Sequence, residues 1–524
     1  MSKKQKLELT WIGKGDEPTL EPRILIEDPT KSYGDTETQN MLIHGDNLLA
    51  LKALEQEYSG KVNCIYADPP YNTGSAFSHY EDGIEHSIWL NLMKPRLELF
   101  RNLLHDTGTL WVTLDDNEVY YFKALADEVF GRNNFIISVV WNSRKSKQND
   151  AKISLGHNYI LVYAKDINQA KVKTLGVDAD SYDNPDNDPR GPWKADPFDA
   201  PNLRPNLTYS IKNPNTGVEY MPPQGRCWRT TEEKYLAALS DNRIVFGKTG
   251  KSKPQMKRFL ADAQEKGQVA GTWWDDCGTA TEASKELIKI LGKQDRFATP
   301  KPERLIERVL TLGSDEGDLV MDSFLGSGTT AAVASKMNRK WLGVELGDHA
   351  YTHCKPRLKQ VIDGTDQGGI SKAVGWKGGS GFKFYELATS LLAQDEHGNW
   401  VISKDYDANM LAHAMAKQEG FTYDPSQSTY WKQGFSTEND YIFTTTQHVT
   451  VELLDAIHAA MQDDESLLLA CRAFDGACKD RYDNITVKKI PHILLGRCEF
   501  GRVDYNLNVT ESVESEDIEG DIEE

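Results

Sequence analysis

The stretch Lys61-Val-Asn-Cys-Ile-Tyr-Ala-Asp-Pro-Pro-Tyr-Asn-Thr-Gly74 decides how the whole chain is interpreted. Residues 62–67 are apolar and β-rich, which predicts a buried strand that ends at Asp68. The two prolines that follow stop the strand, because proline has no backbone N–H. The Pro69 carbonyl then lies in a stiff loop between a carboxylate and the Tyr71 ring. These groups suit a planar ligand with an exocyclic amino group, whose N–H bonds they accept and whose ring the tyrosine stacks on. A plain strand-terminating turn is the alternative interpretation.

The length and composition predict a globular protein of several domains. The chain has 524 residues, of which 39% are hydrophobic, and its mean hydropathy is −0.56. We therefore expect two to four domains and a soluble protein. No apolar run of membrane-spanning length and no signal-peptide pattern is visible. The seven cysteines are dispersed without a Cys-x-x-Cys motif, so we expect no metal site, no disulfide framework, no membrane partner and a cytoplasmic location.

The charge of the chain is acidic overall but unevenly distributed. The formal net charge of −19 by itself disfavours a nucleic-acid partner. Residues 511–524 hold eight acids and no base, which predicts a disordered acidic tail. Two stretches are basic, and each is compatible with a DNA contact or with a solvated face. Their basic residues are Arg144, Lys145, Lys147 and Lys152 in the first stretch, and Arg243, Lys248, Lys251, Lys253, Lys257 and Arg258 in the second.

Residues 41–143 alternate between predicted strands and helices, after a polar, turn-rich N-terminal arm at residues 1–40 that we expect to be peripheral. This order is typical of a parallel, doubly wound sheet, which binds ligands at the carboxyl ends of its strands. Asp46, Asp68 and Asp115 fall at such ends, although Asp46 alone is best explained as a helix N-cap. The predicted strands are 41–44, 62–67, 108–114 and 135–141, and the predicted helices are 48–54, 88–104 (with a kink or restart at Pro95) and 119–130.

Residues 144–295 have a different texture, which predicts an inserted, loop-rich module. Nine of the 21 prolines lie between Pro185 and Pro223, a density that excludes long helices. Aromatic residues are interleaved with Arg and Lys in this region. Such residues can grip nucleic acid, but a small domain also needs them for its own core.

The α/β pattern returns in residues 296–370. A helix is predicted at 303–311, a strand at 317–322, a glycine-rich turn at 326–328 and a helix at 331–337. Glycines let a ligand approach the backbone, and a helix N-terminus offers N–H donors. The next strand ends at Glu345, about 20 residues beyond Gly326, where an acid holds ribose hydroxyls in this class of sheet. The stretch has neither a Walker lysine nor a complete G-x-G-x-x-G, which disfavours ATP and NAD.

Together these motifs resemble a known family. Asp68-Pro-Pro-Tyr71 and Asp322-Ser-Phe-Leu-Gly-Ser-Gly-Thr-Thr330 resemble motifs IV and I of S-adenosylmethionine-dependent DNA amino-methyltransferases. With the catalytic loop first and the cofactor loop last, the order is similar to that of β-class adenine-N6 enzymes, above all the modification (Mod) subunit of type III restriction–modification systems. Ser323 departs from the family, which usually has proline there, and we expect it to weaken the rigidity of the turn but not binding. Further similar segments are Gly156–Lys165, Asp188–Lys194 and Phe297–Pro302, and more loosely Asn484–Pro491 and Asp504–Asn508.

The resemblance implies a circularly permuted Rossmann-like methyltransferase sheet with an inserted target-recognition domain and a C-terminal α/β accessory domain. In such a permutation the Asp46 turn lies beside the Glu345 strand, which makes Asp46 a contact for the cofactor adenine as well as an N-cap. The implied domains are an arm (1–40), the catalytic half of the core (41–143), the insert (144–295), the cofactor half (296–370), an interaction domain (371–510, with helices within 452–469) and the acidic tail (511–524).

The resemblance also implies the site residues and the partners. The catalytic residues are Asp68, Pro69, Pro70 and Tyr71. The residues expected to bind S-adenosyl-L-methionine are Asp46, Lys301, Asp322, Phe324, Gly326, Gly328, Thr329 and Glu345. The residues expected to contact DNA are Arg144, Lys145, Arg243, Lys248, Lys251, Lys253, Lys257 and Arg258. The implied partners are double-stranded DNA, a second copy of the chain and a restriction subunit.

The chemistry that follows is methylation of an exocyclic amine. Hydrogen bonds from the amine to Asp68 and to the Pro69 carbonyl localise its lone pair, which then attacks a sulfonium methyl. The target adenine must first be flipped out of the duplex. Cytosine-N4 methylation uses the same loop and remains an alternative, as does a non-catalytic DNA-recognition or scaffold subunit. Methylation of RNA or of a protein amide is disfavoured, because such enzymes usually have Asn in place of Asp68 and no long insert.

Overall fold

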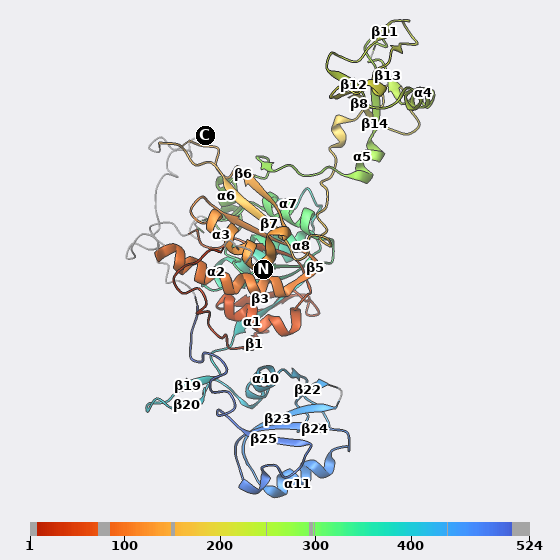
Figure 1. Cartoon of the computed structure of the whole chain (residues 1–524). Coiled ribbons are helices and arrows are strands. Elements are labelled where there is room, and N and C mark those ends of the chain that lie inside the picture. The colour runs from red at the N-terminus through yellow and green to blue at the C-terminus, as the bar shows by residue number, and fades with distance from the viewer. Residues whose placement is uncertain are drawn as a thin grey trace, which may run out of the picture. The chain divides into compact units, whose positions relative to one another are not determined.

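The structure is a computed structural model that describes residues 8–71, 84–147, 152–247, 249–292, 297, 299–437 and 439–505. The chain divides into two compact units, Lys173–Ala270 and the remainder, and Figure 1 shows its helices and strands along the chain. The predicted tail at 511–524 lies outside the described residues. Within the described part, no helix combines the length and the apolar composition needed to cross a bilayer.

The larger unit is built on an eleven-stranded sheet, counted over the described residues. Its main path runs β1-β18-β3-β17-β16-β4-β5-β7-β6-β15, and β2 pairs with β18. The strands are β1 (Leu25–Glu27), β2 (Tyr33–Gly34), β3 (Met41–His44), β4 (Val62–Ala67), β5 (Leu104–Leu114), β6 (Phe135–Trp141), β7 (Asn158–Ala164), β15 (Trp273–Trp274), β16 (Leu319–Asp322), β17 (Lys340–Glu345) and β18 (Gly381–Leu387).

The centre of this sheet is parallel, and its strand order confirms the circular permutation. Strands β3, β17, β16, β4 and β5 pair in parallel, so two strands from late in the chain lie between strands from its beginning. Glu345 pairs with His44, and the Gly45 N–H donates to the Glu345 carbonyl over 3.0 Å. The Asp46 turn therefore lies beside the Glu345 strand, as predicted. The expectation of a wholly parallel sheet is wrong, because β7 is antiparallel to both β5 and β6.

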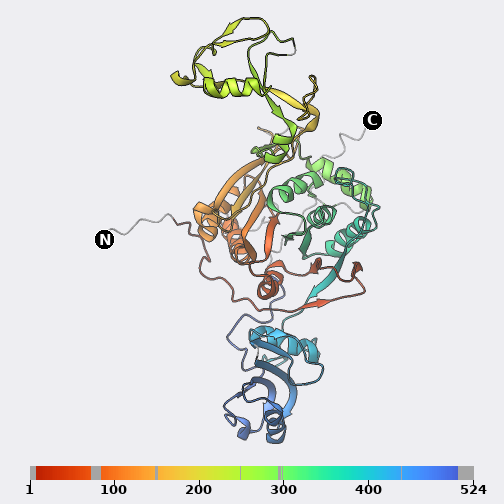
Figure 2. The ribbon, with the colours of Figure 1, turned by 90° about the vertical axis from the view of Figure 1, so that its right-hand side faces the viewer.

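Helices cover both faces of the sheet (Figure 2). Helices α1 (Asn47–Tyr58), α2 (Ile84–Leu103) and α3 (Val119–Ala126) pack together on one face. Helices α6 (Ala280–Leu291), α7 (Glu303–Gly313), α8 (Thr329–Lys336) and α9 (Lys355–Ile362) pack on the other. Helix α2 continues through Pro95 without a restart. The core between the layers is apolar, and Leu97, Phe100, Ile65 and Met321 are fully buried in it.

Three predicted domain boundaries need correction. The N-terminal arm is not peripheral, because β1 pairs with β18 and the Trp11 indole donates to Asn91 Oδ1 over 2.6 Å. The insert is narrower than 144–295, since β7, β15 and α6 belong to the larger unit. The core extends past residue 370, because β18 pairs in parallel with β3. Short strands of this kind escape sequence patterns, since pairing with distant strands stabilises them.

The smaller unit, residues 173–270, is a mixed module around its own apolar core. Phe198, Trp228, Tyr235 and Phe246 are buried in that core, so these aromatic residues serve packing. Its elements are β8 (Trp193–Pro197), β9 (Asp199–Pro201), β10 (Ile211–Lys212), β11 (Glu219–Tyr220), β12 (Arg226–Trp228), α4 (Glu232–Ser240), β13 (Ile244–Val245), β14 (Gln255–Phe259) and α5 (Leu260–Lys266). As the proline density predicts, its helices are short.

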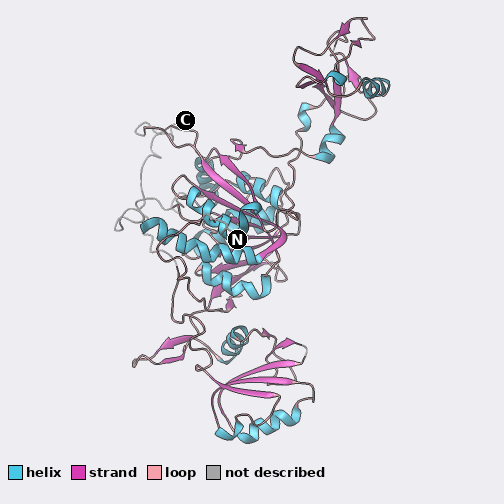
Figure 3. Ribbon diagram, viewed as in Figure 1, coloured by secondary structure: helices cyan, strands magenta, loops and turns pink. Residues whose placement is uncertain are grey.

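The C-terminal residues beyond β18 form a hairpin and a five-stranded sheet of order β21-β22-β23-β24-β25, with α10 on one face and α11 on the other (Figure 3). The predicted helical stretch 452–469 is half right: α11 ends at Ala460, and residues 466–469 begin β24. The elements are β19 (Leu392–Gln394), β20 (Trp400–Ile402), α10 (Ala408–Gln418), β21 (Thr422–Tyr423), β22 (Gly434–Thr437), β23 (Asp440–Val449), α11 (Val451–Ala460), β24 (Ser466–Phe474) and β25 (Ile485–Lys489).

Candidate active site

Two motifs that are far apart in the sequence meet at the carboxyl edge of the sheet. Strand β4 pairs in parallel with β16, in a register that sets Ile65 opposite Met321. Asp68 follows the end of β4, and Asp322 is the last residue of β16. The Asp-Pro-Pro-Tyr loop and the glycine-rich loop therefore leave adjacent strands on the same edge, where open α/β sheets bind their ligands.

Three side chains form a closed polar cluster at the first loop. The Tyr71 hydroxyl donates to Asp68 Oδ1 over 2.8 Å. The Lys301 ammonium pairs with Asp68 Oδ2 and lies 5.4 Å from the centroid of the Tyr71 ring. Lys301 is only 9% exposed, so this ion pair is well shielded from water. The carboxylate is thus oriented as a hydrogen-bond acceptor.

The carbonyls of Pro69 and Pro70 in this loop differ in their hydrogen bonding. The Trp89 indole of α2 donates to the Pro70 carbonyl over 2.8 Å, which ties the loop to the core. No donor to the Pro69 carbonyl is found among the residues that the structure describes. Because a carbonyl and a carboxylate both accept N–H bonds, Pro69 and Asp68 are together suited to a group with two amine hydrogens.

The second loop is shaped by two glycines with left-handed backbones. Gly326 has φ 55° and Gly328 has φ 79°, conformations that residues with a Cβ adopt at a cost. A Cβ at Gly326 would come within 2.9 Å of Phe297 Cζ. Helix α8 begins directly after Gly328, so its first N–H groups point into the loop. The turn is therefore a narrow cradle, and for the N–H groups of Thr329 and Thr330 no acceptor is found among the residues that the structure describes.

Two carboxylates close the second loop. Glu345 Oε2 accepts a hydrogen bond from the Gly326 N–H over 2.7 Å, and burial raises the pKa of its carboxyl. Asp322 accepts from the Phe324 N–H over 2.9 Å and from the Thr330 hydroxyl over 2.5 Å. Burial raises the pKa of Asp322 to about 7. Both acids lie at strand ends beside the glycine-rich turn, at the edge where open α/β sheets bind their ligands.

A buried charge network holds the cradle from behind. The Arg357 guanidinium donates to the Ser327 carbonyl over 3.3 Å, to the Thr329 hydroxyl over 2.8 Å and to Glu303 over 2.9 Å. Glu303 also pairs with the buried Lys336 over 2.8 Å. Because these charges are desolvated and mutually paired, the network specifies one position for the loop.

Both loops and the strands between them lie within one region that matches a known protein family. A family model described as DNA methylase matches residues 62–355 of the chain. The chain belongs to this DNA methylase family. The match spans both loops and the insert, and it covers more than half of the chain.

Several named relatives of this methylase are Mod subunits. It is 32% identical to a probable type III restriction–modification enzyme HindVI Mod subunit of Haemophilus influenzae, over 68% of this chain and 55% of that protein. It is 34% identical to the StyLTI Mod subunit of Salmonella typhimurium, over 58% of this chain and 51% of that protein. It is 24% identical to the DNA adenine methyltransferase YhdJ of Escherichia coli, over 61% of this chain and 81% of that protein. The methylase thus spans about half the length of the two Mod subunits.

The structure commits the polar atoms of Asp46 to protein groups. Oδ1 accepts from the Leu49 N–H over 2.9 Å, which caps α1, and Oδ2 accepts from the Tyr505 N–H over 3.1 Å. The Arg96 guanidinium is 3.6 Å from Oδ2, and Asp46 is 2% exposed. The N-cap prediction is confirmed, whereas contact with a cofactor adenine stays a prediction.

The basic residues expected to contact DNA have very different surroundings in the methylase. Lys257 has to be removed from the set, because it is 2% exposed and its ammonium pairs with Asp186 and Asp188 (2.8 Å to the latter). Arg243 pairs with Asp241 over 2.7 Å and Asp262 over 3.3 Å. The exposed members are Lys145, Lys251, Lys253 and Arg258, with Arg144 half-buried, and Lys248 lies outside the described residues. Sequence could not separate these cases, since the carboxylates that pair with the buried Lys257 are 71 and 69 positions away.

Sequence reasoning missed four residues that shape the site. Phe297 covers Gly326, and its ring meets that of His349 edge to face at 5.0 Å between centroids. Trp89 anchors the Asp68–Tyr71 loop, and Arg357 with Glu303 anchors the glycine-rich loop. Phe297 and Glu303 flank Lys301 in the segment 297–303, so the family resemblance pointed to the segment but not to these roles.

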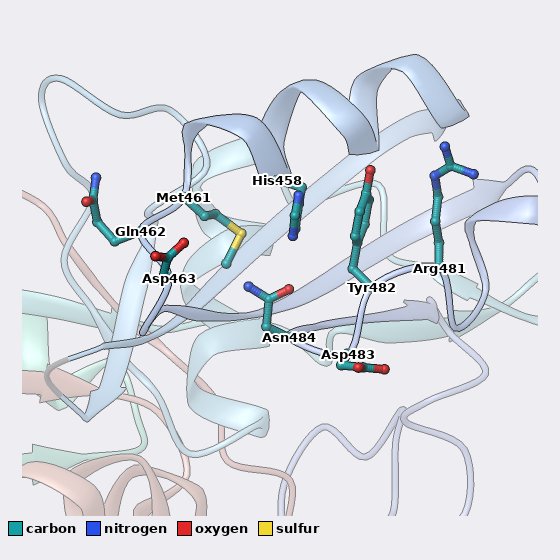
Figure 4. A pocket seen from close by; sticks show the side chains of 8 residues that line it. All are labelled: His458, Met461, Gln462, Asp463, Arg481, Tyr482, Asp483 and Asn484. Carbon is teal, nitrogen blue, oxygen red and sulfur yellow. The ribbon is translucent and has the colours of Figure 1, made fainter.

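A hollow of about 400 Å³ on the C-terminal domain does not belong to this site (Figure 4). The His458 and Tyr482 rings stack in it at 3.7 Å, and Arg481 and Tyr482 are both hydrogen-bonded to Asp455. The Arg481 guanidinium and the Tyr482 hydroxyl in this hollow therefore already have a partner. Among the described residues, no group of three or more metal-ligating side chains is found.

Proposed function

We propose that this methylase transfers the methyl group of S-adenosyl-L-methionine to the N6 amino group of a flipped adenine in duplex DNA. We also propose that it is the modification and recognition subunit of a type III-like restriction–modification or related phage-defence system. Membership of the DNA methylase family supports the reaction class. The relatives named as Mod subunits and as an adenine methyltransferase support the target base and the system.

One observation carries the proposal: the acceptor loop and the glycine cradle leave the adjacent parallel strands β4 and β16. A nucleophilic amine held at Asp68 and a nucleoside held at Glu345 then share one edge of the sheet. This arrangement converts a reaction between two ligands into one between pre-positioned neighbours.

The residues of the second loop fit S-adenosyl-L-methionine. A Cβ at Gly326 would fill the cradle, and Glu345 and Asp322 offer acceptors for ribose hydroxyls and neighbouring polar atoms. Phe324, Gly328 and Thr329 line the same turn, and Lys301 supplies a cation. When bound, this cofactor supplies an electrophilic sulfonium methyl.

The chain's own groups prepare the nucleophile. Asp68 and the Pro69 carbonyl accept the two amine hydrogens, which localises a lone pair that is otherwise delocalised into the base. Tyr71 offers a ring on which the flipped base stacks. The product nitrogen is cationic and releases its proton readily, so no strong general base is required.

DNA is held by the insert and its flanks in this account. Lys145, Lys251, Lys253 and Arg258 are exposed cations, and with Arg144 they are proposed to contact phosphates while the 173–270 unit reads bases. A restriction subunit and a second copy of the chain are the proposed protein partners.

The direct test is sequencing, with modified-base detection, of DNA from cells that express the chain. Modified adenine at one short sequence is the expected result. Modified cytosine would favour the N4 alternative, and unmodified DNA would favour a non-catalytic recognition subunit.

A further inference from the structure

The Lys301 ammonium occupies the groups that the proposed reaction needs for its target base. It pairs with Asp68 Oδ2, while the Tyr71 hydroxyl takes Oδ1. It also lies 5.4 Å from the centroid of the Tyr71 ring. The amine of a bound adenine would have to reach the same carboxylate, and its base would have to stack on the same ring. In this geometry Lys301 and Tyr71 therefore occupy both oxygens of the Asp68 carboxylate.

The position of Lys301 makes it a movable cation on a fixed backbone. It lies between Pro300 and Pro302, whose rings fix their own backbone angles. Its ammonium, however, sits on a flexible four-carbon stem with three rotatable donors. A change of partner at Lys301 therefore requires only side-chain rotation. The same loop leads into α7, whose Glu303 is tied to Arg357 and through it to the cofactor turn.

Charge decides which ligand can draw the ammonium away from Asp68. The carboxylates of Asp322 and Glu345 already accept hydrogen bonds from protein groups, so an ammonium leaving Asp68 needs another anion. The proposed cofactor carries one carboxylate, at the end of its methionine chain. Exchange of one carboxylate for another keeps the cation paired, which avoids the cost of an unpaired charge in a shielded site.

We propose that Lys301 is a shared positioning residue that couples the two ligands, an inference that rests on the proposed function. In the structure Lys301 pairs with Asp68. When the cofactor is bound, Lys301 pairs with its carboxylate, and Asp68 is released to accept the target amine. Cofactor binding then precedes productive base binding, and Asp68 competes with the cofactor for Lys301.

This competition can be measured without catalysis by calorimetry with two ligands. S-adenosylhomocysteine carries the carboxylate, and 5′-methylthioadenosine lacks it. We expect Asp68→Asn to raise the affinity for S-adenosylhomocysteine at least about 5-fold, the lower end of typical coupling between sites, without changing that for 5′-methylthioadenosine. Lys301→Met should weaken S-adenosylhomocysteine about 10-fold and leave 5′-methylthioadenosine unchanged, which also shows that the variant is folded.

The double variant completes the test. In the Lys301→Met background, Asp68→Asn should have no effect on S-adenosylhomocysteine affinity. An unchanged affinity in the Asp68→Asn single variant would overturn the competition, and so would an equal loss of both ligands in Lys301→Met. Failure of the parent chain to bind S-adenosylhomocysteine would instead reject the cofactor assignment on which the inference rests.

Discussion

The backbone N–H of Tyr505 donates a hydrogen bond to Asp46 Oδ2 over 3.1 Å, although the two residues are 459 positions apart. The other oxygen of Asp46 caps α1 through the Leu49 N–H. One buried carboxylate thus fixes both the first helix of the core and the last described residue of the chain. Burial lowers the pKa of the neighbouring Arg96 to about 10, which the Asp46 charge opposes.

Asp46→Asn tests this double role, because asparagine caps a helix as well as aspartate does. The variant keeps the cap but loses an acceptor for Tyr505 and a charge beside Arg96. We expect the free energy of unfolding in urea to fall by about 1–3 kcal/mol. The matched control is Asp407→Asn, since Asp407 caps α10 through the Met410 N–H over 2.8 Å. Equal, negligible losses in both variants would contradict the role.

Gly326→Ala should weaken S-adenosylhomocysteine binding at least 10-fold, on the order of 1.4 kcal/mol. Its Cβ would come within 2.9 Å of Phe297 Cζ in the turn. Gly317→Ala is the control, because Gly317 also has a positive φ of 82° but nothing within 4 Å of an added Cβ. If calorimetry gave the same affinity for both variants, the cofactor could not bind at this glycine-rich turn.

The exposed cations of the insert should determine how DNA binding depends on salt. Each phosphate contact releases counterions, so neutralising Lys251, Lys253 and Arg258 together should flatten the plot of log affinity against log salt by roughly one unit per contact. Methylation should weaken at all sites alike, because phosphates carry no base information. The parental slope in this triple variant would favour the solvated-face alternative.

Lys257→Gln should behave differently from that triple variant. It removes the ammonium that lies 2.8 Å from Asp188, so that this carboxylate keeps only its pair with Arg190, over 2.8 Å, and the unit should lose stability. We expect a lower melting temperature for the 173–270 unit. Limited proteolysis at rising temperature measures this change. Unaltered protease resistance would show that the Lys257–Asp188 pair contributes little to the stability of the 173–270 unit.

The pH dependence of stability should carry the signature of Asp322. Its folded pKa of about 7 lies above its ordinary value of 3.8, so the folded state loses stability as pH rises through that window. Asp322→Asn cannot ionise. We therefore expect its melting temperature, relative to that of the parent, to be more favourable at pH 8 than at pH 5. An identical difference at both pH values would contradict a raised pKa.

Much of the core was predictable, because its strands are apolar and end at polar motifs. Strands β4, β6 and β17 have the predicted bounds, and the family resemblance supplied the permuted order. The edges of the sheet were not predictable. β1 forms because it pairs with β18, and β18 in turn pairs with β3; such long-range pairing leaves little trace in local sequence.

The residues of the candidate site also divide into those that the sequence could predict and those that it could not. Asp68, Tyr71, Gly326 and Glu345 belong to local motifs that a sequence displays. The pairing of Lys301 with Asp68 and of Lys257 with Asp188 depends on contacts across 233 and 69 positions. A basic residue in sequence therefore could not be assigned to phosphate, to cofactor or to a buried carboxylate before the fold was known.

In the proposed reaction Asp68 positions an adenine amine for methylation. The most direct measurement is nucleoside mass analysis after incubation of duplex DNA with the purified chain and S-adenosylmethionine that carries a labelled methyl group. We expect labelled N6-methyladenine with the parent chain and no labelled N6-methyladenine with Asp68→Ala. Label in N4-methylcytosine, or undiminished N6-methyladenine with Asp68→Ala, would contradict it.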